Sequence, residues 1–504
     1  MAKRGDASHV LRHDGLFFNS LYLFHGFNSE QYQNKNGEPG HADSHGFRLS
    51  SDLSWIWVLS LFLLYWVCQH DAPSLLQGES QMLIIVIFIF LLIIGTPIVF
   101  VLGISGAASI LQANLPLVLV PQRMFVGLNS FLLISVPLFI LAGNLMDACG
   151  ITPRIVNFSN MLVGRIKGGL SFVTLVAMDF SSGITGAGAA DTAAIGSVMI
   201  PVMIKEGYKP EYAAGLTAVG ATVGPIIPPS IAFVIYGAMT EVSIAELFLA
   251  GFIPGFMFTL ALMVVARYYA VKDNHPVRII QVTWKEFFKA TIEALPAIMM
   301  PLLVLGGILT GIFTPTEAAG AGVFYSLVIG IFVYRELKPE RLWPILKETA
   351  IMSGGIMLLV ANASLFSWIL AAEGIPQTVA NGIRSLTQNP YMVLFWINLF
   401  LLFMGCIMET LATIIILVPV LLPLVKSLGI DPLHFGVVMV VNLSIGLATP
   451  PVGVNLFVAS GIAKISLEKI SKAVWLFLIA LLIPLALITY IPQITLWVPG
   501  LFLK

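Results

Sequence analysis

The sequence has 504 residues, of which 58% are hydrophobic and 10% are charged, and its mean hydropathy is +0.94. This composition lies far outside that of soluble globular domains, so lipid is the expected solvent of most of the chain. The 26 basic and 26 acidic residues cancel, which leaves no net positive charge for binding a nucleic acid. The three cysteines show no C-x-x-C spacing, so neither a disulfide framework nor a zinc site is expected.

The N-terminal region, residues 1–81, differs from the rest of the chain. Residues 1–50 carry five of the eight histidines in a polar stretch without a helical or strand period, and we expect a disordered N-terminal tail on the cytoplasmic side. Residues 53–68 form a short, Trp-rich apolar segment that lacks the small-residue cleavage site of a signal peptide. Residues 51–81 are therefore predicted to hold an extra transmembrane helix and a linker.

From residue 80 onward, apolar segments long enough to cross a membrane follow one another. Gly95, Pro97 and Pro116 interrupt the first run, which is expected to form two short passes. Segments 170–205 and 391–426 are too long for one pass and contain glycine and polar residues at their midpoints. Each is expected to form the two short arms of a re-entrant hairpin. The remaining segments are predicted at 129–147, 211–238, 247–270, 292–312, 315–334, 346–370, 433–460 and 473–491.

The two long segments belong to an internal repeat. We call the shift along the chain that takes Gly224 to Gly446 the repeat shift. It places the polar midpoint SSGITGAG, which starts at Ser181, opposite MGCIMETL, which starts near Met404. The repeat shift also aligns further Gly and Pro residues: Pro201 with Pro423, Gly207 with Gly429, Pro210 with Pro432, Pro228 with Pro450, and Pro229 with Pro451. We therefore expect two repeats, at about 129–270 and about 346–491.

Five apolar segments separate the two hairpins, and an odd number of crossings inverts the second repeat relative to the first. The side on which the first hairpin opens collects most basic residues: Arg154, Arg165, Lys167, Lys205, Lys209, Arg267, Lys272, Arg278, Lys285, Lys289, Arg335, Lys338, Arg341, Lys347, Lys464, Lys469 and Lys472. The other side collects Arg123, Arg384, Lys426 and Lys504. The positive-inside rule therefore predicts that the first hairpin opens to the cytoplasm and the second opens outward. Inverted repeats with broken elements at mid-membrane are typical of secondary transporters.

Each repeat contains a helix break that frees backbone carbonyls. In residues 224–229, Pro228 and Pro229 cannot donate backbone hydrogen bonds, so carbonyls near Gly224 and Ile227 lose their partners. The second break, 446–451, adds the hydroxyl of Thr449. Such backbone survives at membrane depth only where it is buried or lines a wet cavity, and neutral oxygen cradles suit sodium. The alternative is that the proline pairs merely kink packed helices.

Ionisable residues inside apolar segments are costly and indicate function. Glu409, in the second hairpin tip, is the strongest candidate. Asp191, after the first tip, fits a functional role or a backbone-capping role. Glu317 follows Pro315 and is expected to complement the helix dipole as a first-turn acid, and Asp147 is expected at a helix end. Two polar residues just after the proline pairs are further candidates for substrate contact: Ser230 and Asn455.

Several motifs between Met82 and Leu501 resemble one family, the tripartite ATP-independent periplasmic (TRAP) transporters, and in particular their DctM-type large membrane subunit. These motifs are PLFILAGNLMD from Pro137, SSGITGAGAADTAAIG from Ser181, PPSIAFVIYGAMTEVSIAELFLAGFIPG from Pro228, FTPTEAAGAG from Phe313 and LGIDPLHFGVVMVVNLSIGLATPPVGVNLFVASGI from Leu428. Residues 1–81 match no part of that subunit, so residues 82–504 are predicted to form the permease domain.

The resemblance implies an all-α polytopic membrane protein with inverted repeats, two re-entrant hairpins and an elevator-type ion transporter fold. It implies a sodium-driven importer, not an enzyme, in the bacterial inner membrane. A periplasmic binding protein would deliver a small organic acid, either a C4-dicarboxylate or a sialic-acid-like carboxylate. A small membrane subunit of four helices would enlarge the scaffold.

The resemblance also implies site residues. One hairpin tip residue and the carbonyls of a helix break form each sodium site in the family. These positions map to Ser182, Gly224, Ile227 and Pro228 for the first site, and to Gly405, Gly446, Thr449 and Val452 for the second. Substrate contacts lie between the tips in the family, which maps them near Thr185, Ser230 and Glu409.

Three alternatives remain open at this point. The nearest is a stand-alone sodium/carboxylate symporter of related fold that works without a binding protein. An intramembrane enzyme is disfavoured, because the sequence lacks paired Asp-x-x-x-Asp acids, a Gly-x-Ser-x-Gly elbow and a His-Glu-x-x-His zinc pair. A passive channel is disfavoured because two matched ion cradles beside broken helices fit coupled transport better.

Overall fold

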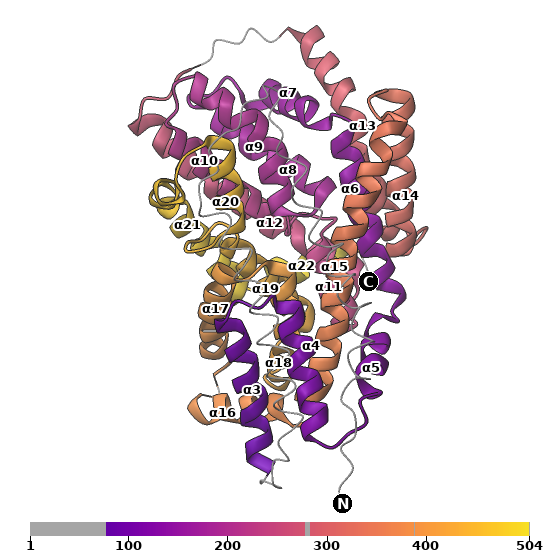
Figure 1. The fold of residues 1–504 in the computed structure, drawn as a ribbon. Coiled ribbons are helices and arrows are strands. Elements are labelled where there is room, and N and C mark those ends of the chain that lie inside the picture. The colour runs from indigo at the N-terminus through magenta and orange to yellow at the C-terminus, as the bar shows by residue number, and fades with distance from the viewer. Residues whose placement is uncertain (1–76, 278–282, 388, 503–504) are drawn as a thin grey trace, which may run out of the picture. The chain divides into compact units, whose positions relative to one another are not determined.

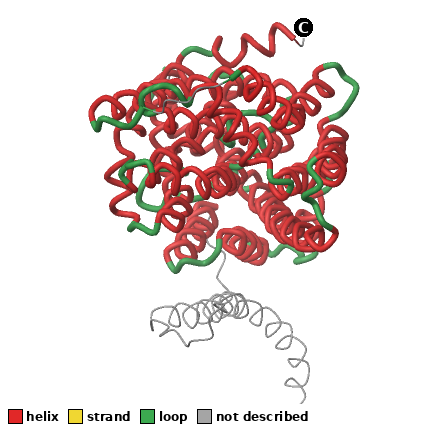
Figure 2. Tube along the Cα trace, turned by 90° about the horizontal axis from the view of Figure 1, so that it is seen from above, coloured by secondary structure: helices red, strands yellow, loops and turns green. Residues whose placement is uncertain are grey.

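Helices make up the secondary structure of the residues that the computed structural model describes, which are 77–277, 283–387 and 389–502. All of them belong to the unit Leu64–Lys504. The predictions for residues 1–50 and for the segment 53–68 lie outside the described residues. Within the described ranges, nine helices are long and apolar enough to cross a membrane. The chain is therefore a multi-pass membrane protein, and Figure 2 shows its helices joined mostly by short loops.

The N-terminal part of this unit forms short helices. Helix α3 spans Gln77–Ile93 and α4 spans Ile98–Gln112, so the run is broken into two short helices as expected. That each of them crosses the membrane stays a prediction. The break contains Gly95, at φ +85°, and Pro97, which precedes the first turn of α4. Three further elements follow, of which the first was not expected from the apolar pattern: α5 (Leu119–Leu128), η2 (Phe131–Ile134) and α6 (Ser135–Ala148).

Both long apolar segments are broken at their midpoints, as predicted. The first forms α8 (Gly169–Thr185) and α9 (Gly188–Lys205), and the second forms α17 (Pro390–Ile407) and α18 (Thr410–Ser427). Gly186 takes φ +62°, a left-handed conformation that glycine adopts without steric cost, and it ends α8. These helices of 17 or 18 residues are about 25–27 Å long, close to the hydrocarbon thickness. The re-entrant topology therefore stays a prediction.

The helix after each pair is interrupted at the predicted proline-rich break. In the first repeat α10 (Pro210–Gly220) and the short η3 (Ala221–Val223) stop before the break, and α11 (Ile231–Thr240) resumes after it. In the second repeat α19 (Pro432–Gly446) and α20 (Val454–Ala463) flank the break. The peptide bonds Pro228–Pro229 and Pro450–Pro451 are both cis. Both predicted helix breaks are confirmed.

Further helices belong to the unit. They are α12 (Ile244–Lys272), α13 (Trp284–Leu309), α14 (Pro315–Val328) with the π-helical η4 (Ile329–Val333), α15 (Pro339–Ala372), α21 (Leu467–Tyr490) and α22 (Gln493–Phe502). The N-terminus of α14 carries a capping box. The backbone N–H of Thr314 donates to Glu317 Oε2 at 2.8 Å, and the N–H of Glu317 donates to Thr314 Oγ1 at 3.3 Å. The predicted role of Glu317 as a first-turn acid is thereby confirmed.

The helix boundaries repeat with the spacing found in the sequence. The repeat shift takes α8, α9 and α10 to within one residue of the starts of α17, α18 and α19, and takes α11 and α12 to within one residue of the starts of α20 and α21. Gly207 and Gly429, which are equivalent, both take positive φ, at +91° and +72°. In Figure 1, α8 and α9 lie in the upper half of the view and α17 and α18 lie in the lower half.

Two short helices occupy equivalent places before the two broken pairs: α7 (Ile151–Val163) precedes α8, and α16 (Ile375–Leu386) precedes α17. Neither was predicted, because polar residues interrupt their apolar pattern. Each begins after a glycine with positive φ, Gly150 at +66° and Gly374 at +68°. Both helices therefore leave their preceding helix at a sharp elbow.

The helices pack in two groups. The first, which we call the α15 group, contains α3 to α6 and α13 to α15, and the second, the repeat core, contains α8 to α12 and α17 to α22. Within the repeat core the two repeats interlock, since α20 packs against α9 and α10, and α11 packs against α18 and α19. Gly436 on α19 allows the fully buried Tyr236 ring of α11 to approach, and the Tyr236 hydroxyl donates to Pro432 O at 2.7 Å. The short helices α7 and α16 contact both groups.

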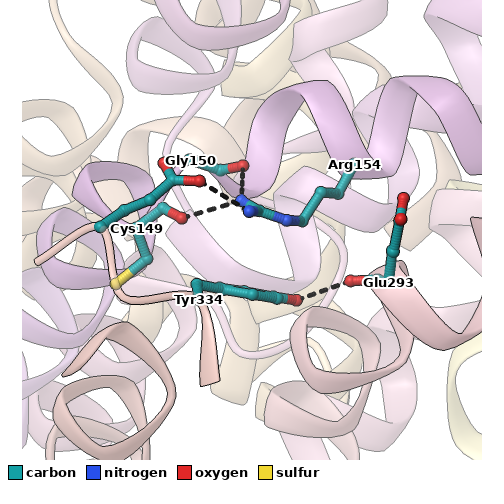
Figure 3. A network of polar contacts seen from close by, with 6 residues as sticks. Cys149, Gly150, Arg154, Glu293 and Tyr334 are labelled. Carbon is teal, nitrogen blue, oxygen red and sulfur yellow. Dashed lines mark hydrogen bonds and ion pairs between the residues drawn. The ribbon is translucent and has the colours of Figure 1, made fainter. Parts of the chain in front are cut away.

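A polar network holds the elbow between α6 and α7 (Figure 3). The Nη1 of Arg154 donates to the carbonyls of Cys149 and Gly150, and its Nη2 pairs with Glu336 Oε1 at 2.6 Å. The guanidinium lies 4.0 Å from the ring centroid of Tyr334, whose hydroxyl donates to Glu293 O at 2.9 Å. The start of α7 is thereby tied to the segment that joins α14 and α15.

Candidate functional site

The first helix tip is organised around a buried carboxylate. Asp191 lies in the first turn of α9 and is fully buried. Its Oδ1 accepts hydrogen bonds from Ser181 Oγ at 2.5 Å and from Thr185 Oγ1 at 2.8 Å, and its Oδ2 accepts one from Ser182 Oγ at 3.0 Å. The carboxylate therefore binds side-chain hydroxyls of α8. The backbone-capping role considered for Asp191 is wrong, because no backbone N–H among the described residues donates to this carboxylate.

The helix break of the first repeat lies directly against this carboxylate. A Cβ atom placed on Gly224 would lie 2.8 Å from Asp191 Oδ2 and 2.8 Å from Gly188 N. Similarly, a Cβ atom on Gly183 would lie 3.6 Å from the carbonyl oxygen of Pro228. No hydrogen bond to the carbonyls of Gly224 or Pro228 occurs among the described residues. The structure thus brings Ser182 and Gly224 to Asp191, and places the Pro228 carbonyl beside Gly183, the residue after Ser182.

Ile227, the remaining residue predicted for the first sodium site, belongs to the same break. Its side chain packs against Gly255 of α12, where a Cβ atom would lie 2.5 Å from Ile227 Cγ1. Its backbone N–H donates to Val223 O at 3.0 Å, and its own carbonyl has no hydrogen-bond donor among the described residues. The side chain thus serves packing, and only the carbonyl is available as a ligand.

The residues predicted for the second sodium site lie around a contact between two glycines. A Cβ atom on Gly446 would lie 2.4 Å from the carbonyl carbon and 2.5 Å from the Cα of Gly405. The N–H of Thr449 donates to Gly446 O at 3.0 Å, and its hydroxyl donates to Ile445 O at 2.7 Å. Val452, between the proline pair and the start of α20, is 36% exposed. Gly405, Gly446 and Thr449 are therefore together, with Val452 at the exposed edge of the break.

Three of the four residues predicted to contact substrate lie around the first tip. A Cβ atom on Gly186 would lie 3.2 Å from Ser230 Cα, which places the end of α8 against the start of α11. Thr185 donates to Asp191, as described, and the Ser230 hydroxyl donates to Pro225 O at 2.5 Å and caps α11. Asn455 of the second repeat reaches this tip, because a Cβ atom on Gly188, at the start of α9, would lie 3.2 Å from Asn455 Nδ2. The same Nδ2 donates to Ala218 O of α10 at 3.1 Å.

Glu409, the fourth of these residues, lies at the other tip. It is the N-cap of α18, and its carboxylate accepts hydrogen bonds from the N–H groups of Leu411 at 3.1 Å and Ala412 at 3.2 Å. The side chain is exposed, whereas Ser230 and Asn455 are buried. The structure therefore separates the predicted substrate contacts into a buried group at the first tip and an exposed acid at the second.

One intramembrane acid was missed in the sequence. Asp179 lies in the middle of α8, and its Oδ1 accepts a hydrogen bond from Thr259 Oγ1 of α12 at 2.5 Å. The rule that selected Asp191 and Glu409, an ionisable residue inside an apolar run, applies equally to Asp179. By contrast, Asp147 lies in the last turn of α6, as predicted.

The cavity around the Arg154 network is a different site. It has a volume of about 590 Å³ and is lined by the start of α7, by α13, and by the end of η4 with the segment that follows it. None of the residues predicted for sodium or substrate lines it. Within the described residues, no group of three or more His, Cys, Asp and Glu side chains could hold a metal ion.

Comparison with known proteins decides the family. Residues 85–494 match the family model described as "Tripartite ATP-independent periplasmic transporter, DctM component". The chain belongs to this family. The resemblance found in the sequence motifs is thus confirmed, and the DctM component is a transporter permease subunit rather than an enzyme.

Several curated DctM relatives align with most of the chain. It is 42% identical over 415 residues to the isethionate TRAP transporter permease protein DctMQ of Oleidesulfovibrio alaskensis. This alignment covers 82% of this chain and 65% of that protein. The chain thus spans less than two thirds of that relative. It is 40% identical to the sialic acid TRAP transporter large permease protein SiaM of Vibrio cholerae, with 82% and 97% of the two chains covered. It is 38% identical to the C4-dicarboxylate TRAP transporter large permease protein DctM of Pseudomonas aeruginosa, with 79% and 93% covered.

Solved structures share the fold of this DctM component at low sequence identity. The YdaH transporter of Alcanivorax borkumensis superimposes with a TM-score of 0.56 at 15% identity and covers 84% of this chain and 98% of its own. MtrF of Neisseria gonorrhoeae superimposes with a TM-score of 0.53 at 13% identity and covers 85% and 97%. The all-α polytopic fold predicted from the sequence is therefore confirmed.

Proposed function

We propose that this chain is the large membrane subunit of a sodium-driven importer of a small organic acid. The observation that carries the proposal is the pair of helix breaks, each lying against a helix tip through a glycine: Gly224 beside Asp191, and Gly446 beside Gly405. Each break offers hydroxyl and carbonyl oxygens without a basic side chain among the predicted ligands. Such oxygen sets are the ligands that sodium takes in transporters with broken helices.

The charge of the substrate follows from the relatives and from the helix ends. The names of the relatives give isethionate, sialic acid and C4-dicarboxylates, which are all anions at neutral pH. Helices α11 and α20 both begin at the breaks, and the N-terminus of a helix favours negative charge. We propose a C4-dicarboxylate or a sialic-acid-like carboxylate as substrate, held near Thr185, Ser230, Glu409 and Asn455.

The two helix groups support an elevator mechanism. The repeat core contains both tips and both breaks, whereas the α15 group contributes none of the predicted ligands. In the proposed mechanism the repeat core carries sodium and substrate across the membrane against the α15 group. The short helices α7 and α16, which contact both groups, would change their angle at Gly150 and Gly374 during this movement.

The partners proposed are a periplasmic substrate-binding protein and a small membrane subunit of four helices, and the proposed location is the bacterial inner membrane. The family description, which calls the transporter tripartite and periplasmic, supports both. The small subunit would enlarge the α15 group, and the binding protein would deliver substrate from the periplasmic side.

Reconstitution tests the proposed function. Proteoliposomes that contain this chain and the small subunit should take up labelled substrate only when an inward sodium gradient and the binding protein are both present. Proteoliposomes with this chain alone should show no uptake. Full-rate uptake by the chain alone would instead support a stand-alone sodium/carboxylate symporter. Uptake that persists with potassium in place of sodium would contradict sodium coupling.

The Thr449→Val substitution probes the second sodium site. Valine nearly preserves the volume of threonine but removes the hydroxyl oxygen, whose proton is already committed to Ile445 O. We expect the variant to fold and to need about five- to tenfold more sodium for half-maximal uptake, because one ligand of several is lost. Thr291→Val is the matched control, since Thr291 makes the same bond, to Phe287 O, on α13. An unchanged sodium requirement in Thr449→Val would remove this hydroxyl from the site.

A further inference from the structure

The hydroxyl groups at the first tip have already donated their only protons. A serine or threonine hydroxyl has one proton to donate and two lone pairs. Ser181, Ser182 and Thr185 all donate that proton to Asp191. What the Ser182 and Thr185 hydroxyls can offer to a further partner is therefore a lone pair, which suits a cation.

Asp191 prevents these hydroxyls from turning back to their own helix. Earlier on the same helix Thr174 donates to Leu170 O at 2.8 Å, and on α10 Thr217 donates to Ala213 O at 2.8 Å. This is the ordinary bond of a helical threonine. Without the carboxylate, the hydroxyls of the first tip would have the same choice. Asp191 thus fixes the direction in which their oxygens point.

An ionised Asp191 would have no counter-charge among the residues that the structure describes. No basic side chain pairs with it in the described ranges, although it is fully buried. Among the described residues, its stabilisation comes from three hydroxyl dipoles and the N-terminus of α9. Its Oδ2 faces Gly224, where the break leaves carbonyls without donors. A monovalent cation bound beside these oxygens would neutralise the carboxylate.

The second repeat has no equivalent of this arrangement within the described residues. The repeat shift places Thr413 opposite Asp191, and the Thr413 hydroxyl donates to Glu409 O at 2.9 Å. The positions opposite the three hydroxyls are apolar: Phe403, Met404 and Ile407. The two repeats share their backbone course but differ in the charge at the tip.

We infer that Asp191 is a positioning residue that sets the sodium affinity of the first site, so that the two sites bind sodium unequally. This inference rests on the proposed sodium coupling. At the first site the negative charge of Asp191 lies directly behind the ligand Ser182, which donates to it, and this site binds sodium more tightly. The second site consists of neutral oxygens and fills at higher sodium concentration.

The test is sodium-dependent thermal unfolding of the purified chain, which needs neither substrate nor partner. The wild-type protein should be stabilised in two phases as sodium chloride replaces choline chloride. Asp191→Asn should shift the tighter phase to at least about tenfold higher sodium, because a full charge near the cation is lost. Thr413→Val, at the equivalent position of the second repeat, should leave the tighter phase unchanged.

A second variant separates positioning from folding. Ser181 is not a predicted sodium ligand, so Ser181→Ala can act on the first site only through Asp191. It should raise the half-saturating sodium of the tighter phase by about threefold, while Ser444→Ala, another buried helical serine, should not. A purely structural role would lower the unfolding temperature without sodium and leave the half-saturating concentration unchanged.

The outcomes distinguish this inference from the proposed function. Unchanged half-saturating sodium in Asp191→Asn would overturn the role of Asp191 while leaving sodium coupling intact. If Asp191→Asn does not fold, Ser181→Ala decides instead: an unchanged half-saturating sodium concentration of its tighter phase would also overturn the role of Asp191. A wild-type protein that sodium does not stabilise would overturn both the inference and the sodium coupling on which it rests.

Discussion

Replacing Gly446 by alanine is expected to leave little folded protein in the membrane. The added Cβ would lie 2.4–2.5 Å from backbone atoms of Gly405, and a backbone in a packed helix cannot rotate away as a side chain can. The substitution should therefore cost more than about 3 kcal/mol, the upper end of ordinary overpacking. Size-exclusion profiles and thermal unfolding of the solubilised protein will measure the loss.

Gly461→Ala is the matched control for this substitution. Gly461 also lies in a helix of the second repeat, α20, but a Cβ atom there meets no atom within 4 Å. Alanine should keep or slightly raise the stability, because it favours helix by about 1 kcal/mol over glycine. A Gly446→Ala protein as stable as Gly461→Ala would show that α17 and α19 are farther apart at this point than the structure places them.

Single cysteines at Lys205 and Lys426 are expected to react with a membrane-impermeant thiol reagent from opposite faces of the membrane. Both lysines are exposed, in the last turns of α9 and α18, at the open ends of the two broken pairs. The inverted repeat and the basic-residue asymmetry predict that Lys205 faces the cytoplasm and Lys426 the periplasm. Labelling of intact cells and of inside-out vesicles, in a background without native cysteines, will show this.

A third cysteine, at the exposed Lys285 near the start of α13, serves as the control for orientation. It should label together with Lys205. Labelling of the cysteines at Lys205 and Lys426 from the same face would contradict the inversion. Labelling of the cysteine at Lys285 from the same face as the one at Lys426 would contradict the predicted orientation of α13.

The backbone of the site was predictable from the sequence because glycine and proline punctuate it. Proline cannot donate a hydrogen bond, so Pro228 and Pro229 had to end a helix, and their repetition at 450–451 located the second break. The spacing between these motifs also placed the starts of the equivalent helices to within one residue. The helix breaks and the repeat register therefore followed from local chemistry alone.

The side-chain network of the first tip was not predictable in the same way. Nothing in the spacing of Ser181, Ser182 and Thr185 shows that all three turn to Asp191, since each could bond its own helix instead. Helices α7 and α16 were missed because a search for apolar runs passes over amphipathic helices. These features depend on which elements lie side by side, which only the three-dimensional structure shows.

The interlocking of the two repeats has a consequence for the order of assembly. Asn455 binds the carbonyl of Ala218 and Tyr236 binds that of Pro432, so each bond joins the first repeat to a much later part of the chain. During synthesis the first repeat enters the membrane long before these partners exist. Until the second repeat is synthesised, the break at 224–229 and the carboxylate of Asp191 lack the helices that cover them in the folded protein. Nascent chains stopped before α17 should therefore be especially exposed to membrane proteases and dependent on insertion chaperones.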